Sequence, residues 1–298
     1  MGRDPRLGLA LGGGGVRGGA HIGLLKVLDR EGIEVGPIAG TSAGGLVGGL
    51  YAAGLSGREI EEFLTGLARG RLLDPEPSGW SLLSTGRFAR MVARRVGHAP
   101  IEDLPHPFAA VAVDLRQACQ VLITHGPLAT AIQATIAVPG LLCPVEQDGC
   151  LLVDGGVLNN VPVDAVRRLG AERVLAVDVK VQTDFSLDTP LRVWQAPLPG
   201  LLPRLIDRLL TLTGRQRAIA ALSRTIDIVS AELAAQQLRA SPPDLLLHPD
   251  LSAIPLLSIA HLPEAIAAGE RLAEAHLGEI RALALAAAAG VAAGAQGA

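Results

Sequence analysis

The sequence predicts a three-layer α/β/α fold with a mainly parallel central sheet. Short apolar runs alternate along the chain with segments of helical character, and this order of elements builds a sheet with helices on both faces. One of these runs, Arg173 to Lys180, is apolar enough to be a parallel strand that is buried on both faces. We expect one domain over residues 1–284 and a disordered Ala/Gly-rich tail over residues 285–298.

The composition is that of a globular protein. Hydrophobic residues make up 49% of the 298 residues and charged residues 18%, which excludes a disordered chain. Aromatic residues are only 2%, so aliphatic side chains must fill the core. A net charge of -3 gives no reason to expect a nucleic-acid partner. The sequence does not predict the oligomeric state.

Cysteine usage and the first residues favour a cytoplasmic location. Cys119, Cys143 and Cys150 lack the spacing of metal ligands and leave an odd thiol, so a reducing compartment is the simpler assumption and no metal is expected. The first residues lack the length and the cleavage site of a signal peptide. No apolar stretch reaches the roughly 20 residues that a membrane-spanning helix needs.

The first element is a short strand, Leu7 to Leu11, that leads through a glycine loop to a helix from Gly19 to Glu31. Successive glycines let backbone amides point into one concavity, which is typical of an anion site. Gly13, Gly15 and Gly18 also satisfy the dinucleotide pattern G-x-G-x-x-G. That pattern needs an acidic residue after the second strand, where this chain has a serine instead, so we expect no cofactor.

The second strand, Pro37 to Gly40, runs into the stretch around which the chain is organised. Gly40 to Gly44 match G-x-S-x-G, the nucleophile elbow that lifts a serine oxygen clear of a sheet, so Ser42 is the candidate nucleophile. Glycine suits the flanking positions because the backbone folds back too closely there for a side chain. A helix from Ala43 to Ala53 would aim its amides at the reacting oxygen, and glycine amides facing the serine would form an oxyanion hole. Arg17 either adds positive charge at this site or ties the loop down by pairing with a carboxylate.

Helices and strands continue to alternate after the elbow. Further helices are expected over Leu55–Ala68, Arg87–Val96, Leu128–Val138, Leu205–Leu238 and Pro263–Leu283. Further strands are expected over Phe108–Leu115, Cys119–His125, Leu151–Val153, Arg173–Lys180 and Asp244–Leu247. Two irregular loops, Arg69–Gly86 and Asp184–Pro203, carry Trp80 and Trp194. These tryptophans either form an apolar rim that contacts a membrane surface or pack on the body of the domain.

Asp154 follows the strand over Leu151–Val153 and begins the sequence D-G-G with Gly155 and Gly156. Taken alone, an Asp-Gly pair usually marks a turn. At this point the residue is either a solvated turn residue or a catalytic carboxylate.

Three motifs stand in one order: G-G-G-x-R-G from Gly13 to Gly18, G-T-S-A-G around Ser42, and D-G-G at Asp154. With the stretch Ala134–Pro144 and the element Asn160-Val161-Pro162, this order resembles the patatin-like phospholipase family, and most of all its compact bacterial members. Each motif is weak alone, whereas the three together in this order are specific. The resemblance covers about the first 180 residues.

The resemblance implies a patatin-like fold and a Ser-Asp dyad, in place of a triad, that acts on acyl esters of lipids. Carried over by position, Ser42 looks like the nucleophile, Asp154 the general base, and the amides of Gly13, Gly14 and Gly15 the oxyanion hole. The expected partner is a lipid or another acyl ester, without a cofactor. The supporting positions would be Arg17, Gly40, Gly44, Gly155 and Gly156.

Two alternatives are kept. An α/β-hydrolase with a Ser-Asp-His triad would need a late histidine, for which His248, His261 and His276 are candidates by position; we interpret all three as structural or surface residues. The chain could also be a catalytically silent or regulatory protein that binds acyl groups on the same scaffold. The intact pair Ser42 and Asp154 argues against that alternative.

Overall fold

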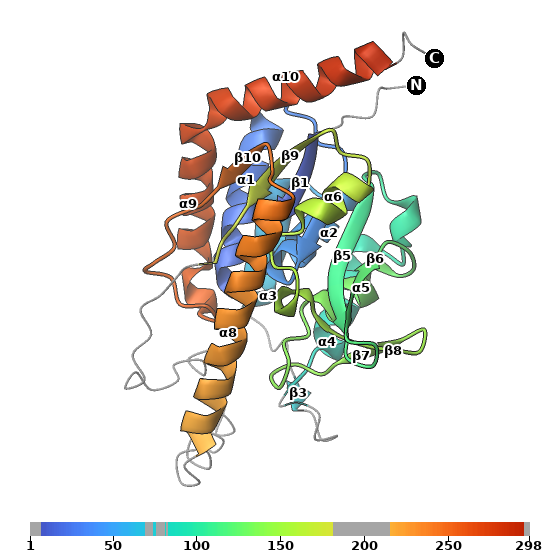
Figure 1. Ribbon diagram of the computed structural model, residues 1–298, viewed down its shortest axis with the longest axis vertical. Helices are drawn as coiled ribbons and strands as arrows, with labels where there is room; N and C mark the ends of the chain where they lie inside the picture. Colours follow the sequence, from blue (N-terminus) through green and yellow to red (C-terminus); the bar gives the residue numbers. More distant parts are fainter. Residues whose placement is uncertain (1–6, 69–73, 76–80, 82, 181–214, 295–298) are drawn as a thin grey trace.

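The computed structural model describes residues 7–68, 74–75, 81, 83–180 and 215–294. In these residues a central sheet lies between two layers of helices (Figure 1). The strand order is β10-β9-β1-β2-β5-β8-β7, and β6 also pairs with β5. The strands from β10 to β5 in this order are parallel, and β6, β7 and β8 pair antiparallel, which confirms the mainly parallel sheet. The strands are β1 (Leu7–Leu11), β2 (Ile38–Thr41), β5 (Phe108–Asp114), β6 (Cys119–Ile123), β7 (Val145–Gln147), β8 (Cys150–Asp154), β9 (Arg173–Val177) and β10 (Leu245–Leu247).

Side chains of the strands alternate between two hydrophobic cores. On β1, Leu9 and Leu11 belong to the larger core and Ala10 to the smaller one. The smaller core has small residues because α6 lies close to the sheet: a Cβ on Gly8 would collide with Val166. The larger core is covered by α1 (Gly19–Arg30), α2 (Ala43–Ala52), α3 (Gly57–Ala68), α4 (Gly86–Val96), α5 (Leu128–Thr135), α9 (Leu262–Ala275) and α10 (Leu277–Gly294), and the smaller core by α6 (Val163–Arg168) and α8 (Arg215–Ala240).

Helices α1 and α9 pack closely although they lie at opposite ends of the chain (Figure 1). Glycines permit this approach: a Cβ on Gly23 would collide with the carbonyl of Ile266, and a Cβ on Gly269 with the carbonyl of Ala20. The contact between the two helices therefore helps to hold α1, which begins directly after the glycine loop.

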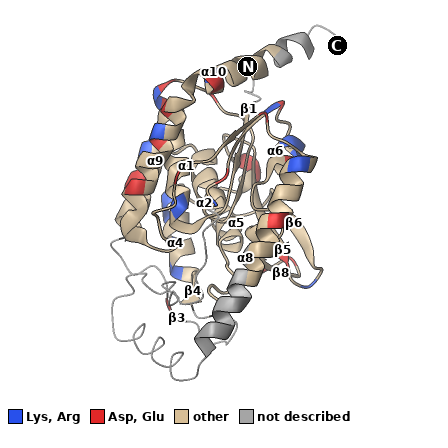
Figure 2. Ribbon diagram, turned by 60° about the vertical axis from the view of Figure 1, so that its left-hand side comes forward, with Lys and Arg blue, Asp and Glu red and all other residues tan. Residues whose placement is uncertain are grey.

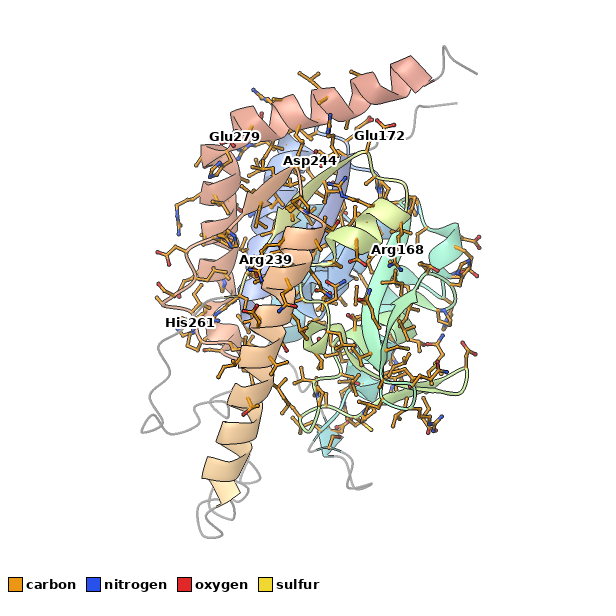
Figure 3. The ribbon with its side chains drawn as sticks, viewed as in Figure 1. Arg168, Glu172, Arg239, Asp244, His261 and Glu279 are labelled. Carbon is orange, nitrogen blue, oxygen red and sulfur yellow. The ribbon has the colours of Figure 1, made fainter. Side chains whose placement is uncertain are left out.

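Charged residues of the described part of the chain lie mostly on the outer helices and loops (Figure 2). Asp244 is labelled near the start of β10 in Figure 3. It accepts hydrogen bonds from Arg173 at 3.0 Å and from Arg167 at 3.3 Å. Both arginines are substantially exposed, and exposed ion pairs of this kind contribute little to stability.

The C-terminal region differs from the prediction. In place of one closing helix over Pro263–Leu283 there are two, because the chain turns at His276 between α9 and α10. The expected disordered tail is wrong for residues 285–294, which continue α10. Alanine is the strongest helix former, and Ala287 on this helix is buried, so the segment has both the propensity and a contact to keep it helical.

Smaller differences concern the ends of elements. Helix α5 ends at Thr135, earlier than the predicted Val138, and strand β7 was not predicted. Within the predicted loop Arg69–Gly86, two very short strands pair, β3 (Asp74–Pro75) with β4 (Leu83–Ser84). Residues 205–214 of the long predicted helix, Trp80 and Trp194 lie outside the described residues. In the part of the chain that the structure describes, no helix has the length and apolar character to cross a membrane.

Candidate active site

Strand β5 brings the ends of β2 and β8 together. One edge of β5 pairs with β6. Along the other edge, β2 places Thr41 opposite Val111, and β8 places Asp154 opposite Ala112. Because Val111 and Ala112 are consecutive and the two strands approach from opposite directions, Asp154 lies beside Ser42, the residue that follows β2.

Ser42 occupies a strained turn between β2 and α2. Its backbone has φ 54° and ψ -122°, a region that residues other than glycine rarely adopt and that costs on the order of 1–3 kcal/mol. The flanking glycines are required sterically: a Cβ on Gly40 would collide with the carbonyl of Gly44, and a Cβ on Gly44 with the carbonyl of Leu11. This is the local geometry that the G-x-S-x-G pattern predicts.

Thr135 holds this turn in place, a role that the sequence analysis missed. The backbone amide of Ser42 donates to Thr135 Oγ1 at 2.9 Å, and that hydroxyl donates to the carbonyl of Val111 at 2.5 Å. Thr135 is completely buried at the end of α5. The helix carries two threonines, Thr130 and Thr135, and only Thr135 is buried, so the sequence alone did not show which of the two hydroxyls needs partners.

Asp154 is a buried carboxylate that contacts the serine. The side chain of Ser42 lies within reach of a hydrogen bond to this carboxylate, and Asp154 Oδ1 accepts the amide of Gly156 at 2.7 Å. Burial raises the pKa of the Asp154 carboxyl to about 6, while the nearby Ser42 side chain, the amide of Gly156 and the charge of Lys180 lower it. The side chain is therefore a stronger base than an ordinary aspartate, yet it is mostly ionised at neutral pH.

Glycine is needed at the two positions after Asp154 for different reasons. A Cβ on Gly155 would collide with the carbonyl of Val111, so only a residue without a side chain fits where the chain passes β5. Gly156 supplies the amide that binds Asp154, and a Cβ there would approach Asp154 Oδ1 to 3.1 Å.

The glycine loop lies against the serine, but its hydrogen bonds differ from those expected of a three-amide oxyanion hole. A Cβ on Gly13 would lie 3.0 Å from the Cβ of Ser42, so the two residues are in close contact. The amide of Gly13, however, donates to the carbonyl of Asn160 at 3.2 Å and is not free to bind an oxyanion. Among the described residues, the amides of Gly14 and Gly15 have no acceptor. The expected three donors are thus reduced to two.

Two buried basic side chains hold the loop. Arg17 Nε donates to the carbonyl of Ile254 at 2.8 Å, so this side chain helps to tie the loop down. His21, which the sequence analysis did not select, has its Nε2 2.7 Å from the carbonyl of Gly12. Burial lowers the pKa of His21 to about 4, more than the bond to Gly12 raises it, so the ring is neutral and Nε2–H donates.

The late histidines have other partners. His248 lies 3.9 Å from Asp178, and His276 Nδ1 lies 2.8 Å from a carboxylate oxygen of Glu279. His261 Nδ1 lies 2.7 Å from the hydroxyl of Ser258, just before α9 at the side of the molecule (Figure 3). Of the described groups that shift the pKa of Asp154, none is a histidine. The arrangement around Ser42 is a serine–carboxylate pair beside free amides, which can attack a carbonyl carbon and hold the oxyanion that results.

Comparison with known proteins places these residues within a known pattern. A sequence profile of the family described as "Patatin-like phospholipase" matches residues 9–167, which include the glycine loop, Ser42 and Asp154. An uncharacterised NTE family protein of Mycobacterium tuberculosis is 42% identical over 182 residues, covering 59% of this chain and 49% of that protein. A second one from the same species is 32% identical over 284 residues, covering 91% of this chain and 46% of that protein.

The matches also include an insect protein and a solved structure. The neuropathy target esterase sws of Drosophila melanogaster is 35% identical over 190 residues, covering 61% of this chain and 13% of that protein. Among solved structures, VipD from Legionella pneumophila aligns with a TM-score of 0.47 and 17% identity, covering 58% of this chain and 49% of that chain. The chain spans about half the length of the mycobacterial relatives that it matches.

Proposed function

Because the chain belongs to the patatin-like phospholipase family, we propose that it is a serine acyl hydrolase that cleaves acyl esters of lipids through a dyad of Ser42 and Asp154. The observation that carries the proposal is that strand register places the serine side chain within reach of a hydrogen bond to the buried carboxylate. The strained turn at Ser42 and the free amides of Gly14 and Gly15 support it.

The first step forms an acyl-enzyme. Ser42 Oγ attacks the acyl carbon of the ester while Asp154 accepts the hydroxyl proton, for which its raised pKa suits it. The carbonyl oxygen becomes negative and is held by the amides of Gly14 and Gly15, where one lost donor costs about 3 kcal/mol. Asp154 then gives its proton to the leaving alcohol as the carbon–oxygen bond breaks.

The second step releases the fatty acid. A water molecule gives a proton to Asp154 and attacks the acyl carbon, and the same amides hold the second oxyanion. Collapse of this intermediate breaks the bond to Ser42 Oγ, which takes back the proton from Asp154. The dyad returns to its starting state, and no cofactor takes part in either step.

The experiment is active-site labelling combined with ester hydrolysis. A fluorophosphonate probe is expected to label the protein at Ser42, and Ser42→Ala is expected to abolish labelling. Asp154→Asn is expected to abolish hydrolysis of a p-nitrophenyl ester without loss of the circular dichroism spectrum. Ser252→Ala, at an exposed serine, serves as the matched control and should behave like the wild type. Labelling at another serine would overturn the proposal.

The lipid substrate is identified with a panel of phospholipids, lysophospholipids and acylglycerols analysed by mass spectrometry. Product that forms with the wild type and not with Ser42→Ala identifies the lipid and the acyl position. Hydrolysis of none of these lipids by a protein that the probe labels would restrict the proposal to other acyl esters.

A further inference from the structure

Asn160 binds the glycine loop through both its backbone and its side chain. Its carbonyl accepts the amide of Gly13 at 3.2 Å, and its Nδ2 donates to the carbonyl of Gly13 at 3.3 Å. Asn160 is buried, with 6% of its surface exposed. It belongs to the same short segment as Asp154, so this segment supports both the base and the loop that lies against Ser42.

The bond to the Gly13 carbonyl determines where the next amide points. In a planar trans peptide the C=O of one residue and the N–H of the following residue point in opposite directions. When Asn160 holds the carbonyl of Gly13, the amide of Gly14 is directed away from Asn160. The same reasoning applies one residue further on, because the carbonyl of Gly14 accepts the amide of Arg17 at 3.2 Å and so orients the amide of Gly15.

This control matters because glycine has little conformational preference of its own. Four consecutive glycines, Gly12 to Gly15, can rotate their peptide planes at low cost. An oxyanion hole contributes to catalysis only when its donors already point at the oxygen before the reaction. The Gly13–Gly14 peptide lies next to Ser42, since a Cβ on Gly13 would lie 3.0 Å from the serine Cβ.

We propose that Asn160 is a positioning residue that aims the amide of Gly14 at the developing oxyanion. The inference rests on the proposed function. It differs from a purely structural role in what it predicts: loss of the Asn160 side chain weakens binding of the transition state and leaves binding of the substrate unchanged.

The test compares Asn160→Ala and Asn160→Asp with the wild type. Aspartate has the shape of asparagine but lacks the N–H donor. The aspartate variant therefore removes the bond to the Gly13 carbonyl without leaving a cavity, and it can be measured even if the alanine variant does not fold. For each variant we would measure kcat and KM on a p-nitrophenyl ester and the affinity for an alkyl trifluoromethyl ketone, which forms an oxyanion on addition of a serine. We expect kcat to fall about 100-fold, ketone affinity to fall in parallel, and KM to change less than about threefold.

Asn159→Ala is the matched control. Asn159 is the adjacent asparagine, is completely buried, and donates its side-chain amide to Asp164 at 2.7 Å rather than to the loop. We expect this variant to lose stability while kcat stays within about threefold of the wild type.

The outcomes separate this inference from the proposed function. A parallel fall in kcat and ketone affinity at position 160 alone supports the inference. Loss of thermal stability without a change in kcat, or a rise in KM alone, would overturn it while leaving the hydrolase intact. A wild-type protein that neither hydrolyses esters nor reacts at Ser42 would instead overturn the proposed function.

Discussion

The side chain of Ser42 lies within hydrogen-bonding reach of the carboxylate of Asp154, because β2 and β8 run toward each other along β5 and end beside consecutive residues. The contact depends on the register of both strands. Thr41 pairs with Val111 and Asp154 with Ala112, so a slip of one residue in either strand would separate the two side chains or turn one to the other face. The proposed dyad therefore depends on the pairing of the sheet and not on either motif alone.

The strain at Ser42 predicts a difference between two inactive variants. Ser42→Gly and Ser42→Ala both lose the hydroxyl, but only glycine accepts φ 54° without strain. We expect the glycine variant to have a free energy of unfolding about 1 kcal/mol higher than that of the alanine variant. Urea unfolding measures this difference. Equal midpoints would show that the turn is not strained in solution.

The pKa of Asp154 predicts the pH dependence of activity. The proposed dyad needs an ionised carboxylate, and the pKa of this group is raised from 3.8 to about 6. We expect kcat/KM to rise with pH through a transition near pH 6 and then to level off. Initial rates on a neutral ester between pH 4 and pH 8 measure it. A transition near pH 4 would mean that Asp154 is solvated or is not the base.

The same pKa predicts a pH dependence of stability. The folded protein holds the Asp154 proton more tightly than the unfolded chain, so this contribution to stability is present below about pH 4 and is lost as the pH rises through about 6. Relative to Asp154→Asn, the wild type should lose about 3 kcal/mol of unfolding free energy across that window. Urea unfolding of both proteins at several pH values gives the difference. A difference that does not change with pH would contradict the burial of this carboxylate.

Thr135 offers a test of how the elbow is held. Thr135→Val keeps the side-chain shape and removes the hydroxyl that links the Ser42 amide to the Val111 carbonyl. We expect a loss of about 1–3 kcal/mol of unfolding free energy together with a fall in kcat, because the buried carbonyl of Val111 loses its donor and the elbow loses its anchor. Thr135→Ser, which keeps the hydroxyl, should retain most of the activity. If valine and serine behave alike, the hydroxyl has no such role.

Alanine substitutions at Gly44 and Gly66 test whether the elbow needs glycine for steric reasons. A Cβ on Gly44 would collide with the backbone of Leu11, so Gly44→Ala should destabilise the protein by several kcal/mol and abolish activity. Gly66 lies inside α3 with open space around it, and Gly66→Ala should stabilise the protein by about 1 kcal/mol. Thermal unfolding and ester hydrolysis of both variants measure this contrast. A tolerated alanine at position 44 would contradict the close approach of α2 to β1.

Much of the fold could be predicted because its signals are local. The strand over Leu7–Leu11 and the helix that follows it depend on side-chain periodicity within a few residues, and the structure confirms them. The turn at Ser42 was predictable for the same reason, since it needs small residues at fixed distances from the serine. The helix at the end of the chain was not predicted, because the sequence pattern of an alanine-rich segment does not show whether a core is present for it to pack on.

The sequence by itself determined most of the succession of strands and helices along the chain, the strained serine and the presence of an Asp-Gly-Gly turn. Only the tertiary structure shows that Asp154 lies beside Ser42. It also shows that Thr135 holds the elbow and His21 the loop. The hydrogen bond from the Gly13 amide to the Asn160 carbonyl is likewise visible only there. The physical reason is that these contacts join residues far apart in the chain, so they depend on which strands are neighbours and in which register they pair. The orientation of a glycine peptide is even harder to predict from the sequence, because glycine accepts nearly every backbone angle. Hydrogen bonds to residues that are near in space determine the orientation instead.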